Sequence, residues 1–454
     1  MEKKLQPQEV AREQFQETTA FLNVVRQSLA RQGVANLEAI ELGLREALFK
    51  DGRRLLEQLY DQPGLQVPDN ASRPGEKCHP DRVKDIDTLF GVIKLQAGRN
   101  YFYDPATNTG RFPLDQALGL VHSFSPALVR LAARAAAKEG YESASADLLA
   151  QSGVSLEGRQ IHRLVNLSAP ALAAQLEQGA NTDPTPIPIL YVEVDGTGVP
   201  MVAEELAGRA GKQEDGSAKT REAKLGAIFT QTKPDEEGRP VRDHASTTYV
   251  GSFESAPDFG SRIRAEGRRR GLGQAAKVVF IGDGAAWIWE LARVNFPAAI
   301  LILDLYHALE RVHELCAGLY GKDSAWALRM VTAWTAMLKN DQISEVIAAA
   351  RCRLQDLQLP PDDPLEKQIA FFENHQAKMR YKTYRDQGLF YGSGVIEGGC
   401  KSVIGQRLKE SGMFWTESGA TSVLNLRLAL KSNRWDECWN RLNHSDYLKI
   451  KIAA

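Results

Sequence analysis

The chain has 454 residues, of which 43% are hydrophobic and 25% are charged, which is ordinary for a globular protein of two or more domains. Its formal net charge of −1 argues against a wholly basic protein that coats nucleic acid, although local basic patches can still bind phosphate. Five scattered cysteines exclude a disulfide framework and a cysteine-built zinc ribbon. Since no run approaches the roughly 18 apolar residues of a membrane span, we expect a protein of the reducing cytoplasm without membrane contact.

The N-terminal part of the chain predicts a helical module followed by a small β module. Residues 9–32 and 36–62 carry apolar side chains at helical spacing, which predicts a helical hairpin or arm within residues 1–75. Short apolar runs at 88–93 and 101–103 predict two strands of a small sheet within residues 76–120.

Residues 121–183 predict a compact helical region. Three helices are expected at 126–139, 143–152 and 155–166, and a tight turn at Gly153 precedes the last one. This pattern is typical of a helix-turn-helix and equally of a plain three-helix bundle. In the first case the last helix would offer three side chains to DNA: Arg159, His162 and Arg163. Proline residues then predict a connector at 168–188.

An apolar strand at 188–194 ends at Asp195 and the turn residue Gly196. Open α/β sheets place their chemistry at the carboxyl ends of strands, so Asp195 is a candidate site residue. Glu193 shares its sheet face with Asp195 because side chains alternate along a strand. It is either an accessory residue of the site or a residue without a role in it. Apolar runs at 225–230 and 247–251 predict that two antiparallel strands follow.

Two further apolar runs, at 276–281 and 298–303, lead into the carboxylates Asp283 and Asp304. A helix between them makes a parallel crossover, the usual connection of two such strands. Residues 306–382 are helical by pattern and contain no further strand of this kind. A later helix, opened by a glycine-rich turn, carries Glu397.

These carboxylates together form the parts of a metal site. Oxygen ligands suit hard cations such as Mg²⁺ or Mn²⁺, and two ions roughly 3.5–4 Å apart can flank a phosphorus atom during phosphodiester chemistry. A single strand-end aspartate is more often a turn or helix cap, and a lone histidine such as His307 is more often a core or capping residue. The joint placement of the acidic residues favours the metal site.

Four motifs resemble the DDE transposases of Kra-type bacterial insertion sequences, distant relatives of the Mutator-like group. They are Val194-Asp195-Gly196-Thr197-Gly198-Val199-Pro200, Gly282-Asp283-Gly284-Ala285, Asp304-Leu305-Tyr306-His307 and Gly392-Ser393-Gly394-Val395-Ile396-Glu397. The resemblance implies an α/β, RNase H-like mixed sheet with a helical insertion, preceded by the helical and small β modules. It implies a metal-binding catalytic triad of Asp195, Asp283 and Glu397, and Asp304 and His307 match an aspartate-x-x-histidine motif of the family. Together with Glu193, these two residues are the accessory candidates.

The resemblance also implies the remaining domain boundaries and the partners. The catalytic core would occupy residues 184–305 and 386–454, interrupted by the insertion at 306–385. Relatives often carry a zinc ribbon near residues 103–110, but this chain has no cysteine there, so we expect a metal-free hairpin. Because element ends come in pairs, we expect a homo-oligomer on double-stranded DNA, which includes element ends and target.

The expected activity is metal-dependent cleavage at element ends followed by strand transfer, with two Mg²⁺ or Mn²⁺ ions. Two alternatives are an RNase H-like nuclease without strand transfer and a domesticated, non-catalytic DNA-binding protein. Basic residues outside the helical region are candidates for phosphate contacts, although charge runs more often mark solvated faces. These candidates are Arg268, Arg269, Arg270, Lys401, Arg407 and Lys409.

Overall fold

The computed structural model describes residues 14–32, 36–61, 67, 69–178, 186–209, 211, 218–358, 360 and 363–442. The chain divides into two compact units, residues 1–169 with 439–454 and residues 170–438. No helix in the described ranges has the length and apolar content that crossing a membrane requires. Residues 62–66, and residues 179–185 of the predicted connector, lie outside the described residues.

The first unit begins with the predicted helical hairpin, formed by α2 (Gln16–Gln32) and α3 (Leu37–Tyr60). Asp51 of α3 is buried and fixes the pairing, because its carboxylate accepts hydrogen bonds from the backbone N–H groups of Glu17 and Thr18 at 3.1 and 2.9 Å. These are the otherwise unpaired donors of the first turn of α2.

Two small sheets follow the hairpin. One pairs β2 (Lys84–Thr88) with β3 (Gly91–Leu95), and the other has the order β1-β4-β5, with β1 at Lys77–His79, β4 at Tyr101–Asp104 and β5 at Thr109–Arg111. The predicted strand at 88–93 is therefore interrupted by a turn, since Gly91 has φ +105°, a conformation that favours glycine. The expected hairpin at 103–110 is present as β4 and β5.

The short helix α4 (Pro113–Ala117) leads into α5 (Pro126–Ala136), α6 (Tyr141–Ser152) and α7 (Gly158–Glu177). Gly153, with φ +72°, ends α6 in the left-handed conformation. Contrary to the predicted end near residue 166, α7 continues through Pro170. Its buried side chains, which include Leu164, Val165, Ala169 and Leu172, continue the helical spacing across the proline, so packing outweighs the local break.

The second unit is built on a five-stranded mixed sheet with the order β10-β9-β6-β7-β8. The strands are β6 (Ile187–Pro200), β7 (Thr220–Gln231), β8 (Thr248–Ser252), β9 (Ala275–Gly282) and β10 (Ile300–Leu303). The predicted antiparallel run of β6, β7 and β8 and the predicted parallel pair of β9 and β10 are confirmed. The predicted strand end at Asp195 and turn at Gly196 are wrong, because β6 continues to Pro200 in its pairing with β7. The chain is therefore a mixed α/β protein.

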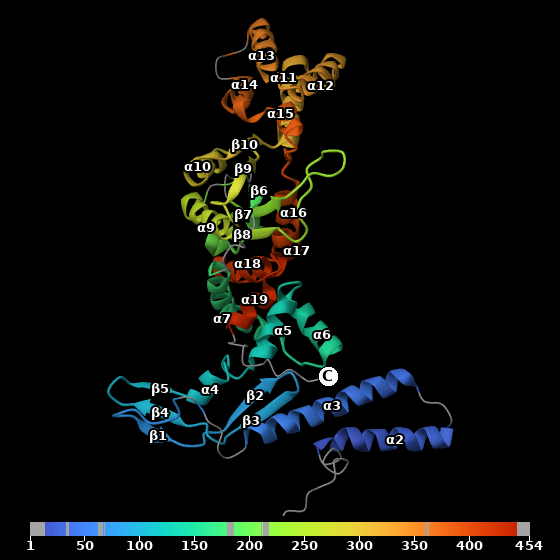
Figure 1. Ribbon diagram of the computed structural model, residues 1–454, viewed down its shortest axis with the longest axis vertical. Helices are drawn as coiled ribbons and strands as arrows, with labels where there is room; N and C mark the ends of the chain where they lie inside the picture. Colours follow the sequence, from blue (N-terminus) through green and yellow to red (C-terminus); the bar gives the residue numbers. More distant parts are fainter. Residues whose placement is uncertain are drawn as a thin grey trace, which may run out of the picture. The chain divides into compact units, whose positions relative to one another are not determined.

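Helices cover both faces of this sheet. Leu190 and Val192 of β6 pack against α9 (Ala256–Arg269) and α10 (Ala286–Asn295). Tyr191 lies on the opposite face, in a core shared with the helices that follow β10. Figure 1 shows α9 and α10 on one side of the strands and α16 (Gly394–Gly399) on the other. By alternation, Glu193 and Asp195 share the face of Tyr191.

The region between β10 and α16 is helical, as predicted. It contains α11 (Leu305–Tyr320), α12 (Ala325–Leu338), α13 (Ile343–Leu357), α14 (Pro364–His375) and α15 (Tyr381–Asp386). Hydrogen bonds from the hydroxyl groups of Tyr381 and Tyr384 to carbonyl oxygens of β10 tie its last helix to the sheet. After α16 come a π-helical turn (Cys400–Gly405), α17 (Gln406–Leu408), α18 (Glu417–Lys431) and α19 (Trp435–Leu442).

Candidate active site

Three aspartates lie side by side where the parallel pairing of the strands ends: Asp283 and Asp304 directly follow β9 and β10, whereas Asp195 lies within β6, two residues beyond its last parallel pair with β9. Glu193 of β6 pairs with Ile281 of β9, so the register continued by two residues sets Asp195 beside Asp283. On the other side of β9, Leu303 pairs with Gly282, and the backbone N–H of Asp304 donates to the Gly282 carbonyl at 2.9 Å. The topology therefore brings all three carboxylates close together.

Asp195 and Asp283 are each held by local hydrogen bonds. Asp195 Oδ1 accepts from the backbone N–H of Gly196 at 2.6 Å, and its Oδ2 accepts from the Cys400 thiol at 3.4 Å. Asp283 Oδ1 accepts from the backbone N–H of Ala285 at 2.8 Å, just before α10. Burial raises the pKa of Asp195, and the nearby charge of Asp283 raises it further.

Asp304 is the most extensively bonded acidic residue of the group. Its buried carboxylate accepts from the backbone N–H of His307 at 2.7 Å, from that of Ser393 at 2.5 Å, and pairs with His307 Nδ1 at 3.1 Å. Burial would raise the pKa of Asp304, but these hydrogen bonds outweigh it and hold the pKa below its ordinary value. The same contact raises the pKa of His307 to about 9, so the imidazole is protonated at neutral pH.

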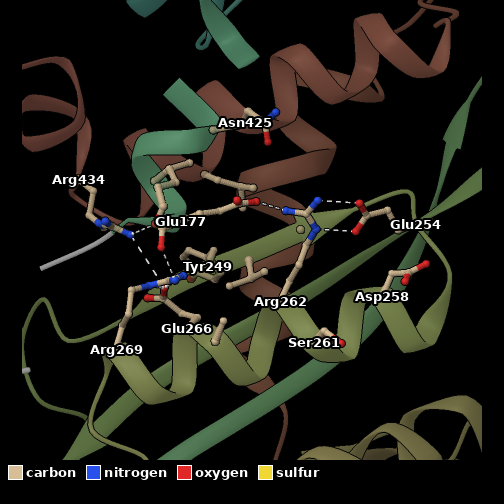
Figure 2. Close-up of a pocket in the computed structure, with 16 residues that line it drawn as sticks. Glu177, Tyr249, Glu254, Asp258, Ser261, Arg262, Glu266, Arg269, Asn425 and Arg434 are labelled. Atoms are coloured by element: carbon tan, nitrogen blue, oxygen red, sulfur yellow. Dashed lines mark hydrogen bonds and ion pairs between the residues drawn. The ribbon is translucent and has the colours of Figure 1, made fainter. Parts of the chain in front are cut away.

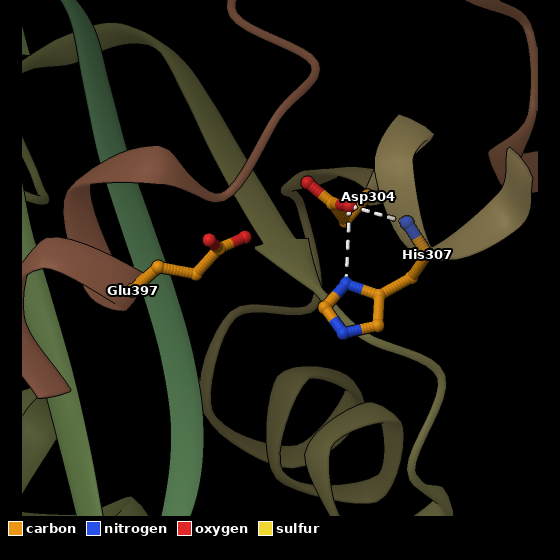
Figure 3. A group of neighbouring side chains, drawn as sticks. All are labelled: Asp304, His307 and Glu397. Carbon is orange, nitrogen blue, oxygen red and sulfur yellow. Dashed lines mark hydrogen bonds and ion pairs between the residues drawn. The ribbon is translucent and has the colours of Figure 1, made fainter. Parts of the chain in front are cut away.

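Glu397 reaches this group from a different element. Figure 3 shows its carboxylate across from Asp304 and His307, on helix α16. One ligand atom from each of these three residues lies within 4.8 Å of the others. Ser393 Oγ donates to Glu397 Oε1 at 3.0 Å and so links Glu397 to the segment that also contacts Asp304.

The predicted triad of Asp195, Asp283 and Glu397 is less closely gathered. Among the residues that the structure describes, it does not meet the 4.8 Å spacing that Asp304, His307 and Glu397 meet. Asp195 and Asp283 are nevertheless close enough to interact electrostatically, since the charge of Asp283 raises the pKa of Asp195. The charge of His307 lowers the pKa of Asp195, and that of Asp283 raises the pKa of His307. The donor set as a whole is rich in carboxylate oxygen, which fits Mg²⁺ or Mn²⁺.

Glu193 anchors α16 to the sheet. Its side chain is fully buried, and Oε2 accepts from the backbone N–H of Ile396 at 2.8 Å. Oε1 has no hydrogen-bond partner among the described residues. Burial raises the pKa of Glu193 to about 8, although the Ile396 hydrogen bond opposes the rise. Glu193 therefore positions the helix that carries Glu397.

Two residues at this site were not predicted from the sequence. Cys400 contacts Asp195, and its pKa is raised, first by burial and then by that carboxylate. It follows Glu397 by three positions, a spacing that brings side chains to one helix face and could have identified it. His375 of α14 forms a hydrogen bond with the backbone of Gly284, the residue after Asp283. Burial lowers the pKa of His375 to about 4. No local pattern connects a residue of the helical insertion with Asp283.

The basic candidates are distributed over different surroundings. Arg159, His162 and Arg163 are exposed on α7, and Arg268 and Lys401 are also exposed. Lys409 contacts the Thr197 hydroxyl near Asp195, and burial lowers its pKa. Arg270 donates to the Ser246 carbonyl at 2.7 Å.

Arg407 is fully buried, which contradicts its predicted contact with phosphate. One of its guanidinium nitrogens donates to the Met413 sulfur at 3.2 Å, and the group lies 5.1 Å from the Trp415 ring centroid. The charge pattern alone could not show that the chain folds back over this side chain.

Arg269 lines a cavity of about 520 Å³ between α9, β8 and α18. Figure 2 shows its guanidinium near Glu266 and Glu177, and Arg262 between Glu177 and Glu254. Arg269 donates to Glu266 at 2.6 Å and to the Glu177 carbonyl at 2.6 Å. These internal contacts already occupy the guanidinium that was predicted to contact DNA.

Comparisons with known proteins identify the family. A protein of Streptococcus gallolyticus described as "UPF0236 protein in vanSb 3'region" is 24% identical over 413 residues, which covers 89% of this chain and 84% of that protein. A solved structure, the Drosophila P element transposase strand transfer complex, aligns with a TM-score of 0.27 and 10% identity over 72% of this chain and 86% of that chain. The model of the Uncharacterised protein family (UPF0236) matches residues 29–437. Because this match spans most of the sequence, the chain belongs to the UPF0236 family.

Proposed function

We propose that this chain is a metal-dependent DNA transposase with an RNase H-like catalytic core. The observation that carries the proposal is that Asp195, Asp283 and Asp304 lie on three neighbouring strands where their parallel pairing ends, with Glu397 brought to the same place by α16. The mixed sheet, interrupted after β10 by a helical insertion, supports the same interpretation.

In each of the two proposed steps, one P–O bond forms and one P–O bond breaks at the same phosphorus. In the first, water attacks a phosphorus at the element end, and the bond to the 3′ oxygen breaks to leave a 3′-hydroxyl. In the second, that hydroxyl attacks a target phosphorus, and the target's own 3′ oxygen leaves. Neither step requires an oxidant or an external energy source.

Asp195, Asp283 and Glu397 are the residues that would hold two Mg²⁺ or Mn²⁺ ions. Such ions, when bound, activate the attacking oxygen and stabilise the leaving oxygen. Hydrogen bonds from Gly196 and Cys400 orient Asp195, while Glu193 and Ser393 orient the helix and side chain of Glu397.

His307 has a separate role in this proposal. Paired with Asp304, it keeps a positive charge at neutral pH beside the other carboxylates. The charge offsets part of their mutual repulsion before ions bind. Lys401, Lys409, Arg268 and the exposed residues of α7 are the proposed phosphate contacts on double-stranded DNA.

The experiment uses the full chain with DNA that carries the sequences flanking its gene. We expect cleavage that requires Mg²⁺ or Mn²⁺, and joining of pre-cut ends with a free 3′-hydroxyl to a supercoiled plasmid. Asp195→Asn, Asp283→Asn and Glu397→Gln should each lower both rates by at least about 100-fold. Glu290→Gln, which removes an exposed carboxylate from α10, is the matched control and should keep wild-type rates.

The outcome distinguishes the proposal from its alternatives. Cleavage without joining would indicate a nuclease, and specific binding without cleavage would indicate a DNA-binding protein. Equal activity in the three triad variants and the wild type would overturn the proposed site.

A further inference from the structure

Helix α3 presents three different faces, and one of them is apolar but uncovered among the described residues. One face packs on the β2–β3 sheet, where Leu56 and Tyr60 join the cluster of Ile86, Ile93 and Leu95. A second face meets α2, where Gly43 lies under the Phe21 ring and Asp51 accepts from the first turn of α2. The third face is a stripe of five leucines, of which Leu37, Leu48 and Leu59 are exposed and Leu44 and Leu55 are half-buried.

Helix α2 carries a matching stripe. Phe15, which precedes its first turn, Leu22 and Leu29 are spaced by seven residues, and all three are exposed. At about 100° per residue, this stripe lies roughly 90° around α2 from Phe21, and the leucine stripe lies roughly 90° around α3 from Ala47. The rotation has the same sense in both helices.

The two stripes therefore form one surface. Because α2 and α3 run antiparallel, a rotation of the same sense about each helix leads to the same side of the hairpin. We call this surface the hairpin face, made of Phe15, Leu22 and Leu29 with the five leucines of α3. Exposed apolar surface on this scale is typical of an interaction site, since monomeric proteins rarely leave large contiguous apolar patches in water.

We propose that the hairpin face binds the hairpin face of a second copy of this chain, so that two hairpins form a four-helix bundle. Two antiparallel helices with one apolar side provide half of such a bundle, and a two-fold axis makes the same surface complementary to itself. The Asp51 contacts that fix the hairpin make the surface preformed, which reduces the ordering cost of association.

Charge also favours a second copy over a strongly charged partner. Residues 14–61 contain six basic and seven acidic side chains, so two hairpins carry almost no net charge and do not repel each other. Arg26 borders the stripe on α2, and Glu41 borders the stripe on α3. A pairing that sets α2 of one copy against α3 of its partner therefore brings opposite charges together. The inference does not depend on the proposed reaction.

The test measures the mass of the full chain, freed of nucleic acid, by sedimentation equilibrium. We expect a dimer at micromolar concentration, with an interface on the order of 800 Å² per partner. Leu48→Glu and Leu22→Glu should weaken dimerisation by at least about 100-fold, because two charges enter the apolar contact in each symmetric dimer. Leu48→Met, which keeps an apolar side chain, should remain dimeric.

The chain offers matched controls. Leu42 of α3 is 50% exposed, compared with 43% for Leu48, but lies on another side of the helix. Val24 of α2 is likewise exposed off the hairpin face. Leu42→Glu and Val24→Glu should stay dimeric, and circular dichroism should show the same helix content in all variants. A monomeric wild type, or equal weakening by Leu48→Glu and Leu42→Glu, would overturn the proposal.

Discussion

Glu193 provides a direct test of how the sheet and α16 are joined. Its carboxyl group is fully buried and accepts a single hydrogen bond, so the protonated form is favoured and the pKa rises from 4.5 to about 8. Between these two values the folded chain holds a proton that the unfolded chain has released. The contribution of Glu193 to stability is therefore full below pH 4.5 and is lost as the pH rises towards 8.

The size of the effect follows from the same values. One pKa unit corresponds to about 1.4 kcal/mol, so a rise from 4.5 to about 8 corresponds to roughly 5 kcal/mol lost across this range. In Glu193→Gln the amide keeps an acceptor for the Ile396 N–H and carries no titrating proton. The variant should gain stability relative to the wild type as the pH rises, by several kcal/mol between pH 5 and pH 8.5.

The assay is urea unfolding followed by tryptophan fluorescence, in EDTA, at intervals from pH 5 to pH 8.5. The difference between variant and wild type cancels the other titrating groups, which both proteins share. Glu222→Gln, on the neighbouring strand but exposed, is the control and should track the wild type. Parallel stability curves for Glu193→Gln and the wild type would refute the reasoning.

Three further predictions concern other contacts. In Asp304→Asn, the pKa of the His307 imidazole should fall from about 9 towards its ordinary value, as followed by NMR, because its charged partner is gone; an unchanged titration would contradict the assigned pair. Asp51→Ala should destabilise the α2–α3 hairpin by about 1–2 kcal/mol, visible as faster amide exchange in the first turn of α2, whereas unchanged exchange would argue against the cap. Iodoacetamide should modify exposed Cys78 and Cys352 well before Cys400, because burial raises the pKa of the Cys400 thiol. Mass spectrometry of the modified peptides gives the order, and earlier modification of Cys400 would contradict its burial beside Asp195.

The sequence predicted those strands and helices whose formation depends on neighbouring residues in the chain. The apolar runs before Asp195, Asp283 and Asp304 predicted the strands that carry them, and the spacing after residue 305 predicted the helical region. β9 and β10, short apolar strands that end just before a carboxylate, need no distant information to be recognised. β6 continues past the predicted turn at Gly196 because it pairs with the distant β7 as far as Pro200. The mixed α/β class followed from the same patterns.

Contacts between distant segments could not be predicted in this way. Glu193 meets Ile396 across 203 positions, and Cys400 meets Asp195 across 205. The burial of Arg407 against Trp415 and the passage of α7 through Pro170 both depend on tertiary packing that outweighs local preference. Pattern therefore identified the acidic residues but not the groups that hold them in place.

The helical region between β10 and α16 leaves the sheet and returns to it at almost the same point. The backbone N–H of Leu305 donates to the Tyr391 carbonyl at 3.0 Å, and that of Ser393 donates to Asp304 at 2.5 Å. Asp304 and Glu397 are thus linked through Ser393, at the point where the excursion begins and ends. These contacts belong to residues on either side of the excursion, so a change in the length of α12 and α13 would leave them in place. Loss of α14 would in addition remove the contact of His375 at Gly284 beside Asp283.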